Sequence, residues 1–532
     1  MVLVAVVLLI AVPLLALART ALEDGLAALL EAVSSAAPAI WASVWTSLGA
    51  TILAVGMGAS VAILTERTTV PGRRGLRMAM LVAFIVPGYV AAMGWLDAYG
   101  PGGLLDDLVG FAAPGLVGPL GIVIVLGVEA APVAFLVVAA GLATRAEPDM
   151  ERAARASGAD AMTAFRTVTL PLLGPVLAGA AIIAFVLSVT SFGVPAVLGI
   201  PAGFSTMTTR IYRDLAFSAD PASFVRALGL AVVLALGVAV VIAIGDALLG
   251  RRRRERSGVF SGPLGYGGGA VRGSAARGSA GGIIAWVIVV LVVVVPLVAL
   301  ALTALARAPG LAPGPASWTL ENFQEVIGPH SLKALVNSTV LAAAAAAGVV
   351  VLAVAVVSAR RGRGVGTIGG LVSLTFALPG STLAVAVLLA YGMALRDTLL
   401  IILVAYLAKF WALGHRPVAA GLDGMAADLL RAARASGADG WTTTRTIVLP
   451  ILRPMIVAGG LIVFVFGLHE VTMSSLLYGP GSATLAVVVL NLQQLGDPGP
   501  TAALAILLTT IVALASLPLL GRTGALERMG WR

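Results

Sequence analysis

Long apolar runs recur along the whole chain, and they constrain its fold more than any other feature. A helix that crosses a membrane needs about 20 mostly apolar residues. Within lipid, a single segment satisfies its own backbone hydrogen bonds only as a helix. We therefore predict an all-α, polytopic membrane protein of about twelve transmembrane helices, at 2–18, 41–64, 78–95, 118–142, 172–199, 226–249, 283–305, 335–358, 367–394, 398–414, 454–478 and 500–521.

Composition excludes several other classes of protein. Hydrophobic residues make up 59% of the 532 residues and charged residues 11%, whereas a soluble domain carries about 25% charged residues. There is no cysteine and there are only three histidines, so we expect no metal site. No nucleophile lies beside a base at a meaningful spacing, so we expect no catalytic residue and no enzyme activity. The net charge of +9 comes without a motif that reads nucleic acid, so we expect no nucleic-acid partner.

The basic residues predict how the helices cross the membrane. Loops on the cytoplasmic side of a membrane protein are enriched in lysine and arginine. With both termini placed in the cytoplasm, 26 of the 34 basic residues fall in cytoplasmic loops, seven fall outside, and Lys409 falls within a predicted helix. Shifting the helices by one crossing would invert this asymmetry. We therefore expect both ends of the chain in the cytoplasm.

A repeated segment divides the chain into two related halves. Residues 152–160 and 431–439 are identical, RAARASGAD, and 16 of 24 aligned positions from Arg152 and Arg431 match. Since each half contains six predicted helices, the halves have the same orientation, as in a parallel repeat. We predict a first unit at 1–250 with a loop at 145–171, a flexible basic cytoplasmic linker at 251–282, and a second unit at 283–532 with a loop at 415–450.

Each repeated segment is predicted to form a helix, a break and a second helix. Alanines and Arg155 favour the first helix. Gly158 can adopt the left-handed conformation that ends a helix, and Asp160 is a candidate N-cap for the next helix, which is expected to run through Phe165. Gly437 and Asp439 occupy the same positions in the second copy. Small residues at the break would allow the backbone of another protein to approach closely.

The repeated segment resembles the EAA loop of permeases from ATP-binding-cassette (ABC) importers. That loop has the pattern E-A-A, three residues, G-A, about nine residues and a hydrophobic-x-Leu-Pro. This chain departs from the pattern at the acidic position, where Arg152 and Arg431 stand, and Glu151 and Asp428 lie near but out of register. The remaining matches are Ala153-Ala154, Gly158-Ala159, Leu170-Pro171, Ala432-Ala433, Gly437-Ala438 and Leu449-Pro450.

The resemblance implies a type I ABC importer permease in which two halves are fused. In that family the loop forms a coupling helix that docks on an ATPase subunit. It implies two copies of an ATPase, which use ATP and magnesium, an extracytoplasmic solute-binding protein, and a place in the bacterial cytoplasmic membrane. This chain has no phosphate-binding G-x-x-x-x-G-K-[ST] loop, so it is not the ATPase and is expected to bind no cofactor. The residues implied at the ATPase contact are Ala153, Ala154, Gly158, Ala159, Asp160, Ala432, Ala433, Gly437, Ala438 and Asp439.

Four polar residues after the loops are candidates for the translocation path: Ser188, Thr190, Ser191 and Glu470. Charged side chains at membrane depth are costly and often functional. Serine and threonine can equally join helices without contacting a solute. Glu129 and Lys409 are the other charged residues within predicted helices, and they can instead pair within the bundle or, for Lys409, reach the membrane surface.

The segments after the loops resemble those of fused ferric-iron-type permeases. Ferric iron is therefore the first expectation for the solute, and thiamine, phosphonate and polyamine are the alternatives. Two other classes stay open. An ion-coupled secondary transporter predicts ionisable residues near the middle of the membrane in both halves, with no need for repeated docking loops. A membrane scaffold predicts that the loops are dispensable.

Overall fold

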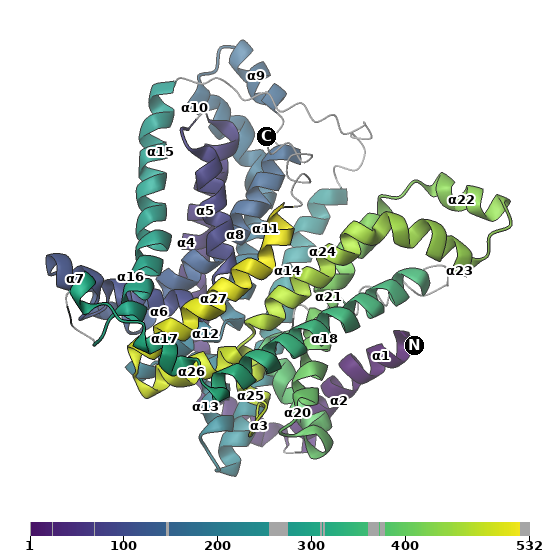
Figure 1. The fold of residues 1–532 in the computed structure, drawn as a ribbon. Coiled ribbons are helices and arrows are strands. Elements are labelled where there is room, and N and C mark those ends of the chain that lie inside the picture. The colour runs from purple at the N-terminus through teal and green to yellow at the C-terminus, as the bar shows by residue number, and fades with distance from the viewer. Residues whose placement is uncertain are drawn as a thin grey trace.

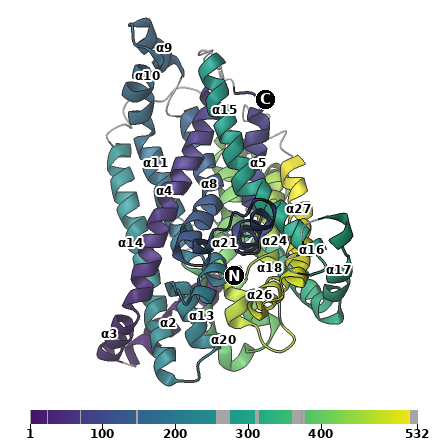
Figure 2. The same ribbon diagram turned by 90° about the vertical axis from the view of Figure 1, so that its left-hand side faces the viewer.

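The computed structural model of the chain describes residues 2–23, 25–68, 70–144, 148–254, 275–308, 311, 314–359, 372 and 378–521. Two bundles of long helices diverge from a shared region, one ending at α9 and α10 and the other at α22 and α23 (Figure 1). A view from the side shows α4, α11 and α14 running nearly parallel through the first bundle (Figure 2). The described residues are almost entirely helical, and one isolated bridge joins Ala306 to Trp318.

The first half contains long helices joined by shorter ones. They are α1 (Val2–Val6), η1 (Val7–Ala11), α2 (Val12–Glu23), α3 (Leu26–Ser35), α4 (Ala37–Arg67), α5 (Arg73–Ile85), α6 (Gly88–Tyr99), α7 (Leu104–Val109), η2 (Pro114–Leu116), α8 (Pro119–Thr144), α9 (Pro148–Ala156), α10 (Ala161–Ala164), η3 (Phe165–Thr169), α11 (Leu170–Thr190), α12 (Gly193–Leu198), η4 (Ile200–Ala202), α13 (Met207–Ala216) and α14 (Pro221–Arg254).

The described part of the second half has a similar series of elements. Its elements are α15 (Ala275–Val289), η5 (Val290–Val294), α16 (Val295–Leu305), η6 (Pro315–Ser317), α17 (Glu321–Val326), α18 (Pro329–Ala359), α20 (Gly380–Leu395), α21 (Leu399–Asp423), α22 (Ala427–Ala435), α23 (Gly440–Thr443), η7 (Thr444–Val448), α24 (Leu449–Leu468), α25 (Thr472–Leu477), α26 (Leu485–Leu495) and α27 (Pro498–Gly521).

The number of helices that can cross a membrane agrees closely with the prediction. Among the described residues, ten helices are long and apolar enough, and a bent pair raises the number to eleven. These ten correspond to ten of the twelve predicted segments. The short predicted segment 398–414 is a full 25-residue helix, α21. The segment 367–394 lies partly outside the described residues, and its described part is α20. The all-α polytopic fold is confirmed.

The predicted continuous helix 78–95 is wrong. The chain breaks between Ile85 and Gly88, and the helix axis bends by 108° at this break. Pro87 is the physical reason, because proline restricts the residue before it to extended conformations and lacks the N–H that would continue the helix. Val86 and Pro87 are both extended. In the second half, Pro379 likewise precedes Gly380, the first residue of α20.

Close helix contacts in the first bundle depend on small residues. α4 packs along α8, and a Cβ at Gly58 would lie 2.6 Å from the carbonyl oxygen of Ala131 and 2.6 Å from the backbone nitrogen of Phe135. A Cβ at Gly127, on the facing helix, would lie 2.8 Å from Cβ of Leu53. Small residues at helix contacts allow backbones to approach within membranes, where dispersion rather than the hydrophobic effect holds helices together.

The first helix of each half packs against the opposite half. Val6, Leu9 and Ile10 share a buried cluster with residues of α18, α20 and α21. In the reverse direction, Ala285 and Val289 of α15 join a cluster built from α4, α5 and α8. The two halves therefore interlock. Most of the predicted linker 251–282 lies outside the described residues, and its described ends belong to helices α14 and α15.

Candidate coupling loops and translocation cavity

The two repeated segments fold into the same structure. In the first, α9 is followed by Gly158 with φ +95°, and in the second, α22 is followed by Gly437 with φ +77°. The next N–H closes each turn, with Ala159 donating to Ala154 at 3.1 Å and Ala438 donating to Ala433 at 3.0 Å. Positive φ is easy for glycine and costly for most other residues. The identical sequences therefore form the same helix C-terminus in both halves.

An aspartate caps the helix that follows each break. Oδ1 of Asp160 accepts a hydrogen bond from the backbone N–H of Thr163 at 2.9 Å. Oδ1 of Asp439 accepts one from Thr442 at 2.8 Å. Both aspartates are extended in φ and ψ, as N-cap residues are. The structure thus places the two predicted aspartates at the N-caps of α10 and α23.

The helix after each cap continues into the membrane without ending. A five-residue π-helical segment, η3 or η7, joins the short helix to the long one, so that Ala161–Thr190 and Gly440–Leu468 are each continuous. The helix expected after Asp160 does run through Phe165, but it continues into the membrane-length helix instead of staying short. Pro171 and Pro450 follow the π segments, where the wider turn removes the requirement for their missing N–H. These helices carry the loops rigidly into the bundle.

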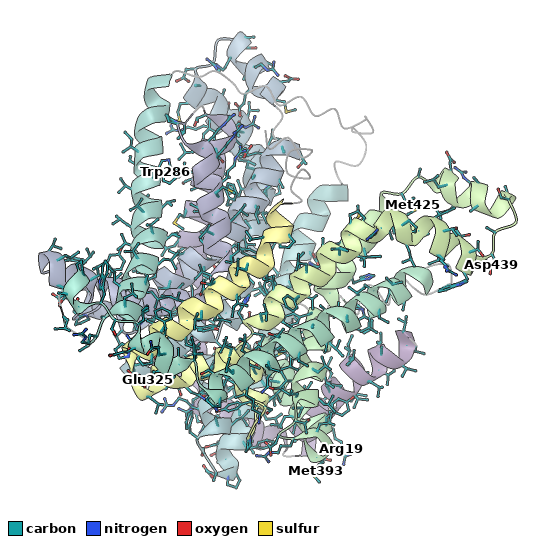
Figure 3. All side chains as sticks on the ribbon, viewed as in Figure 1. Arg19, Trp286, Glu325, Met393, Met425 and Asp439 are labelled. Carbon is teal, nitrogen blue, oxygen red and sulfur yellow. The ribbon has the colours of Figure 1, made fainter. Side chains whose placement is uncertain are left out.

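The loops lie at the far ends of the two diverging bundles (Figure 1), and the side-chain view places Asp439 at the tip of the second (Figure 3). Gly158, Asp160, Gly437 and Asp439 are exposed. The predicted alanines differ, because Ala153 and Ala432 are exposed whereas Ala433 is 6% exposed and packs inside. The glycines and aspartates, together with Ala153 and Ala432, are therefore accessible to another protein, whereas Ala433 is not.

The arginines at the acidic position of the pattern are paired in both halves. Arg152 pairs with Asp149 and Arg431 with Asp428, each one turn earlier on the same exposed helix. Exposed pairs of this kind contribute about 0.2–1 kcal/mol at most, so they add little to the stability of the loops. Glu151 points inward instead, accepting a hydrogen bond from Thr169. The two halves share an Asp-x-x-Arg pair that the sequence analysis did not detect.

We expect the aspartate caps to matter for docking at neutral pH. Hydrogen bonds from the hydroxyl and N–H of Thr442 lower the pKa of Asp439. Because the pKa of Asp439 is lowered in the folded state, its carboxylate is ionised and stabilises the cap fully above the ordinary pKa of an aspartate, about 3.9. This stabilisation is lost only as the pH falls through the lower pKa of the folded state. Asp160→Ala/Asp439→Ala should therefore reduce recovery of a bound ATPase several-fold, whereas the unaltered chain should retain it unchanged from pH 8 to pH 5. Asparagine at both positions keeps a cap and is the control, and equal recovery with alanine would contradict the role.

A cavity of about 250 Å³ lies between the two halves. The first half contributes the break between α5 and α6, one face of α8, and the break between α11 and α12. The second half contributes Phe410, Phe466 and residues 469–472, around the break between α24 and α25. Helix breaks at membrane depth are tolerated where they are buried in protein or line a cavity. The cavity is therefore built at the points where both halves interrupt their helices.

Three of the four predicted path residues line this cavity. Ser188, Ser191 and Glu470 are lining residues. Thr190 is not, and its hydroxyl donates to the carbonyl oxygen of Val186 at 2.8 Å. The carboxylate of Glu470 accepts hydrogen bonds from the backbone N–H groups of Met473 at 2.9 Å and Ser474 at 3.1 Å. Glu470 therefore caps α25, and much of its hydrogen-bonding capacity is used within the protein.

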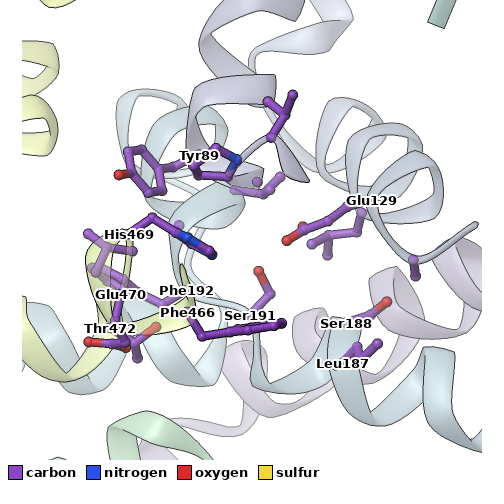
Figure 4. Close-up of a pocket in the computed structure, with 18 of the residues that line it drawn as sticks. Tyr89, Glu129, Leu187, Ser188, Ser191, Phe192, Phe466, His469, Glu470 and Thr472 are labelled. Carbon is purple, nitrogen blue, oxygen red and sulfur yellow. The ribbon is translucent and has the colours of Figure 1, made fainter. Parts of the chain in front are cut away.

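Glu129 reaches the cavity more directly than Glu470 does. Figure 4 shows its carboxylate, the ring of His469 and the hydroxyl of Ser191 pointing toward the middle of the cavity from different sides. Oε2 of Glu129 is buried and has no hydrogen-bond partner among the described residues. The expected alternative, pairing with Lys409, is not observed in this part of the chain, since Nζ of Lys409 donates to the carbonyl oxygen of Leu378.

Comparison with known proteins decides the family. Residues 1–254 and 347–522 match the family described as the binding-protein-dependent transport system inner membrane component. The chain belongs to this family. Its members are membrane-embedded transport subunits of ABC importers, so the predicted fused permease is confirmed, and ATPase and binding-protein partners follow for the family in general.

Individual relatives agree on the class but differ in solute. The ABC transporter permease protein y4fN of Sinorhizobium fredii is 25% identical over 96% of this chain and 93% of its own length. The ferric transport system permease protein FbpB 1 of Haemophilus influenzae is 22% identical over 74% of this chain and 62% of its own length. The 2-aminoethylphosphonate transport system permease protein PhnV of Salmonella paratyphi A is 26% identical over 38% of this chain and 80% of its own length.

Proposed function

We propose that this chain imports a small solute across the bacterial cytoplasmic membrane, through the cavity between its halves. Two ATPase subunits dock on the loops at 148–164 and 427–443. Closure of the ATPases moves the two bundles, and the path opens alternately to each side. The free energy for this change comes from the differential binding of ATP to the two states, so the chain itself needs no cofactor, and magnesium and ATP act in its partners.

The observation that carries this proposal is the matched geometry of the two loops. Gly158 and Gly437 share a left-handed turn, and Asp160 and Asp439 share an N-cap. Each loop continues through a π segment into a helix that ends at the cavity. A force on either loop therefore reaches the cavity along one continuous helix. A membrane scaffold would not need two loops that are each joined to the cavity by a continuous helix.

The solute is the finer part of the proposal. Ferric iron is the first candidate, because the sequence resembles ferric-type permeases and one relative carries that name. Phosphonates follow from another relative, and thiamine and polyamines remain alternatives. The volume of about 250 Å³ suits a small solute. A binding protein on the outer face would deliver it, and both termini would lie in the cytoplasm with the coupling loops.

Uptake in cells that lack this chain tests the function. We expect deletion to abolish ATP-dependent uptake of ferric iron or of one alternative solute, and the unaltered chain to restore it. The uptake should persist when a protonophore collapses the ion gradient, because ATP drives it. An ion-coupled transporter would stop under that treatment. Retained uptake of every candidate solute after deletion, together with no ATPase recovered with the purified chain, would contradict the proposal.

A further inference from the structure

The lining of the central cavity indicates the charge of what it binds. Among its described lining residues, two are glutamates and none is a lysine or an arginine. Glu470 already caps α25, so its carboxylate is largely satisfied. Oε2 of Glu129 is buried without a partner. A buried carboxylate without a hydrogen bond or counter-ion is costly, so this site is completed when a ligand brings a donor with positive charge.

Aromatic rings supply the rest of the wall. Phe84 and Phe466, one from each half, contact edge to face with their centroids 6.1 Å apart. Phe466 also lies 5.6 Å from the ring of His469, and Phe192 and Phe410 line the same space. Ring faces attract cations, and the attraction is strongest where the contact is desolvated. An aromatic wall beside one carboxylate suits an ammonium group that carries an apolar carbon chain.

Further acceptors lie around this carboxylate. Oγ of Ser188 is buried and has no hydrogen-bond partner among the described residues, and the hydroxyl of Ser191 points into the same space (Figure 4). An ammonium group has three donors and no acceptor, so these atoms and Glu129 provide complementary partners. A bare metal ion would need several hard ligands close together. Among the described residues, no group of three or more histidines, aspartates or glutamates could hold one.

We propose that the transported solute carries an ammonium group, which binds to Glu129 against the aromatic wall of Phe84, Phe192, Phe410 and Phe466. This inference rests on the proposed function and replaces ferric iron, its first candidate solute, with an organic cation or an amine-bearing zwitterion. The carboxylate at Glu129 sets the charge selectivity, and the rings and the volume of about 250 Å³ limit the size of the group that enters.

Equilibrium binding of radiolabelled putrescine to the full chain in lipid nanodiscs tests the proposal. We expect Glu129→Gln to weaken binding at least about 30-fold, as loss of one partner of a buried charge pair does. Glu325→Gln is the matched control, because Glu325 is an exposed glutamate on α17, and it should bind as the unaltered chain does. Trehalose, which has no charge, should not compete. Equal binding by Glu129→Gln and the unaltered chain, or no binding of putrescine by the unaltered chain, would overturn the proposal.

A second measurement needs no variant and so does not depend on how Glu129→Gln folds. A hydrophobic carbodiimide should modify Glu129 in the unaltered chain, and putrescine should protect it, as read by mass spectrometry of the modified peptide. Modification that putrescine leaves unchanged would overturn the site. Recovery of the ATPase with each chain separates the two proposals. If the unaltered chain recovers no ATPase, the proposed function fails. If the ATPase is recovered but Glu129→Gln binds putrescine normally, only the ammonium site fails.

Discussion

Gly158→Asp/Gly437→Asp should abolish uptake while the chain still folds and reaches the membrane. Both glycines are exposed at the tips of the bundles, and a Cβ at either position would meet nothing within 4 Å in this chain. Aspartate also tolerates the left-handed backbone better than most residues. The change therefore places a side chain and a negative charge on the surface offered to the ATPase. A buried unpaired charge there should cost at least about 2 kcal/mol per loop, or about 30-fold in docking.

Matched variants separate docking from folding. Gly110→Asp has the same chemistry at a left-handed glycine with equally open surroundings, φ +67° and nothing within 4 Å. Gly110 directly follows α7, which lies far from α9, α10, α22 and α23 (Figure 1). This variant should support normal uptake. Gly158→Asn/Gly437→Asn keeps the shape without the charge and should lie between the two. The measurements are solute uptake and ATPase recovery, and normal recovery with the double aspartate variant would contradict the assignment of the loops.

The sequence predicted the helices well because apolar length is a local property. Ten predicted segments correspond to ten membrane-length helices. The breaks were harder to predict, because apolar residues continue on both sides of Pro87 and only the backbone chemistry of that residue marks the turn. The π segments η3 and η7 were missed for a similar reason.

The path residues could be predicted only in part, because a cavity depends on which side of a helix faces the other half. Ser188 and Ser191 are three residues apart and reach the same space, whereas Thr190 between them does not. Glu470 was predicted to line the path because it is a charged residue at membrane depth, but its carboxylate caps a helix that begins two residues later. No local signal reveals a cap of this kind when the helix is only six residues long.

The two halves also carry different charges near the cavity, although their sequences are related by duplication. VAAGL occurs at 138–142 and 418–422, and this register aligns Glu129 with Lys409. Each side chain lies at the Pro-Gly break of its own half, near Gly88 or beside Leu378. Only Glu129 lines the cavity. The pseudo-symmetric scaffold therefore carries opposite charges at equivalent positions, so that the two breaks should respond differently to the same substitution.

Gly88→Ala should reduce uptake at least about tenfold, whereas Gly380→Ala should leave it nearly normal. A Cβ at Gly88 would lie 2.3 Å from Oε1 of Glu129, which no real contact allows, so the carboxylate must move. A Cβ at Gly380 would meet Cγ2 of Thr472 at 3.4 Å, an ordinary contact. Since the group displaced by Gly88→Ala is the end of a flexible side chain, the free energy of unfolding should change little, and the loss should fall on solute binding.

The pair tests whether the position of the Glu129 carboxylate, rather than the shape of the Pro-Gly break, controls transport. Uptake and putrescine binding should both fall in Gly88→Ala, while thermal unfolding and ATPase recovery match those of Gly380→Ala. A loss of stability in Gly88→Ala would assign the effect to packing instead. Equal uptake by the two variants would mean that the carboxylate can leave its observed place without consequence, and the charge selectivity of the cavity would then have to come from Glu470, which already caps α25.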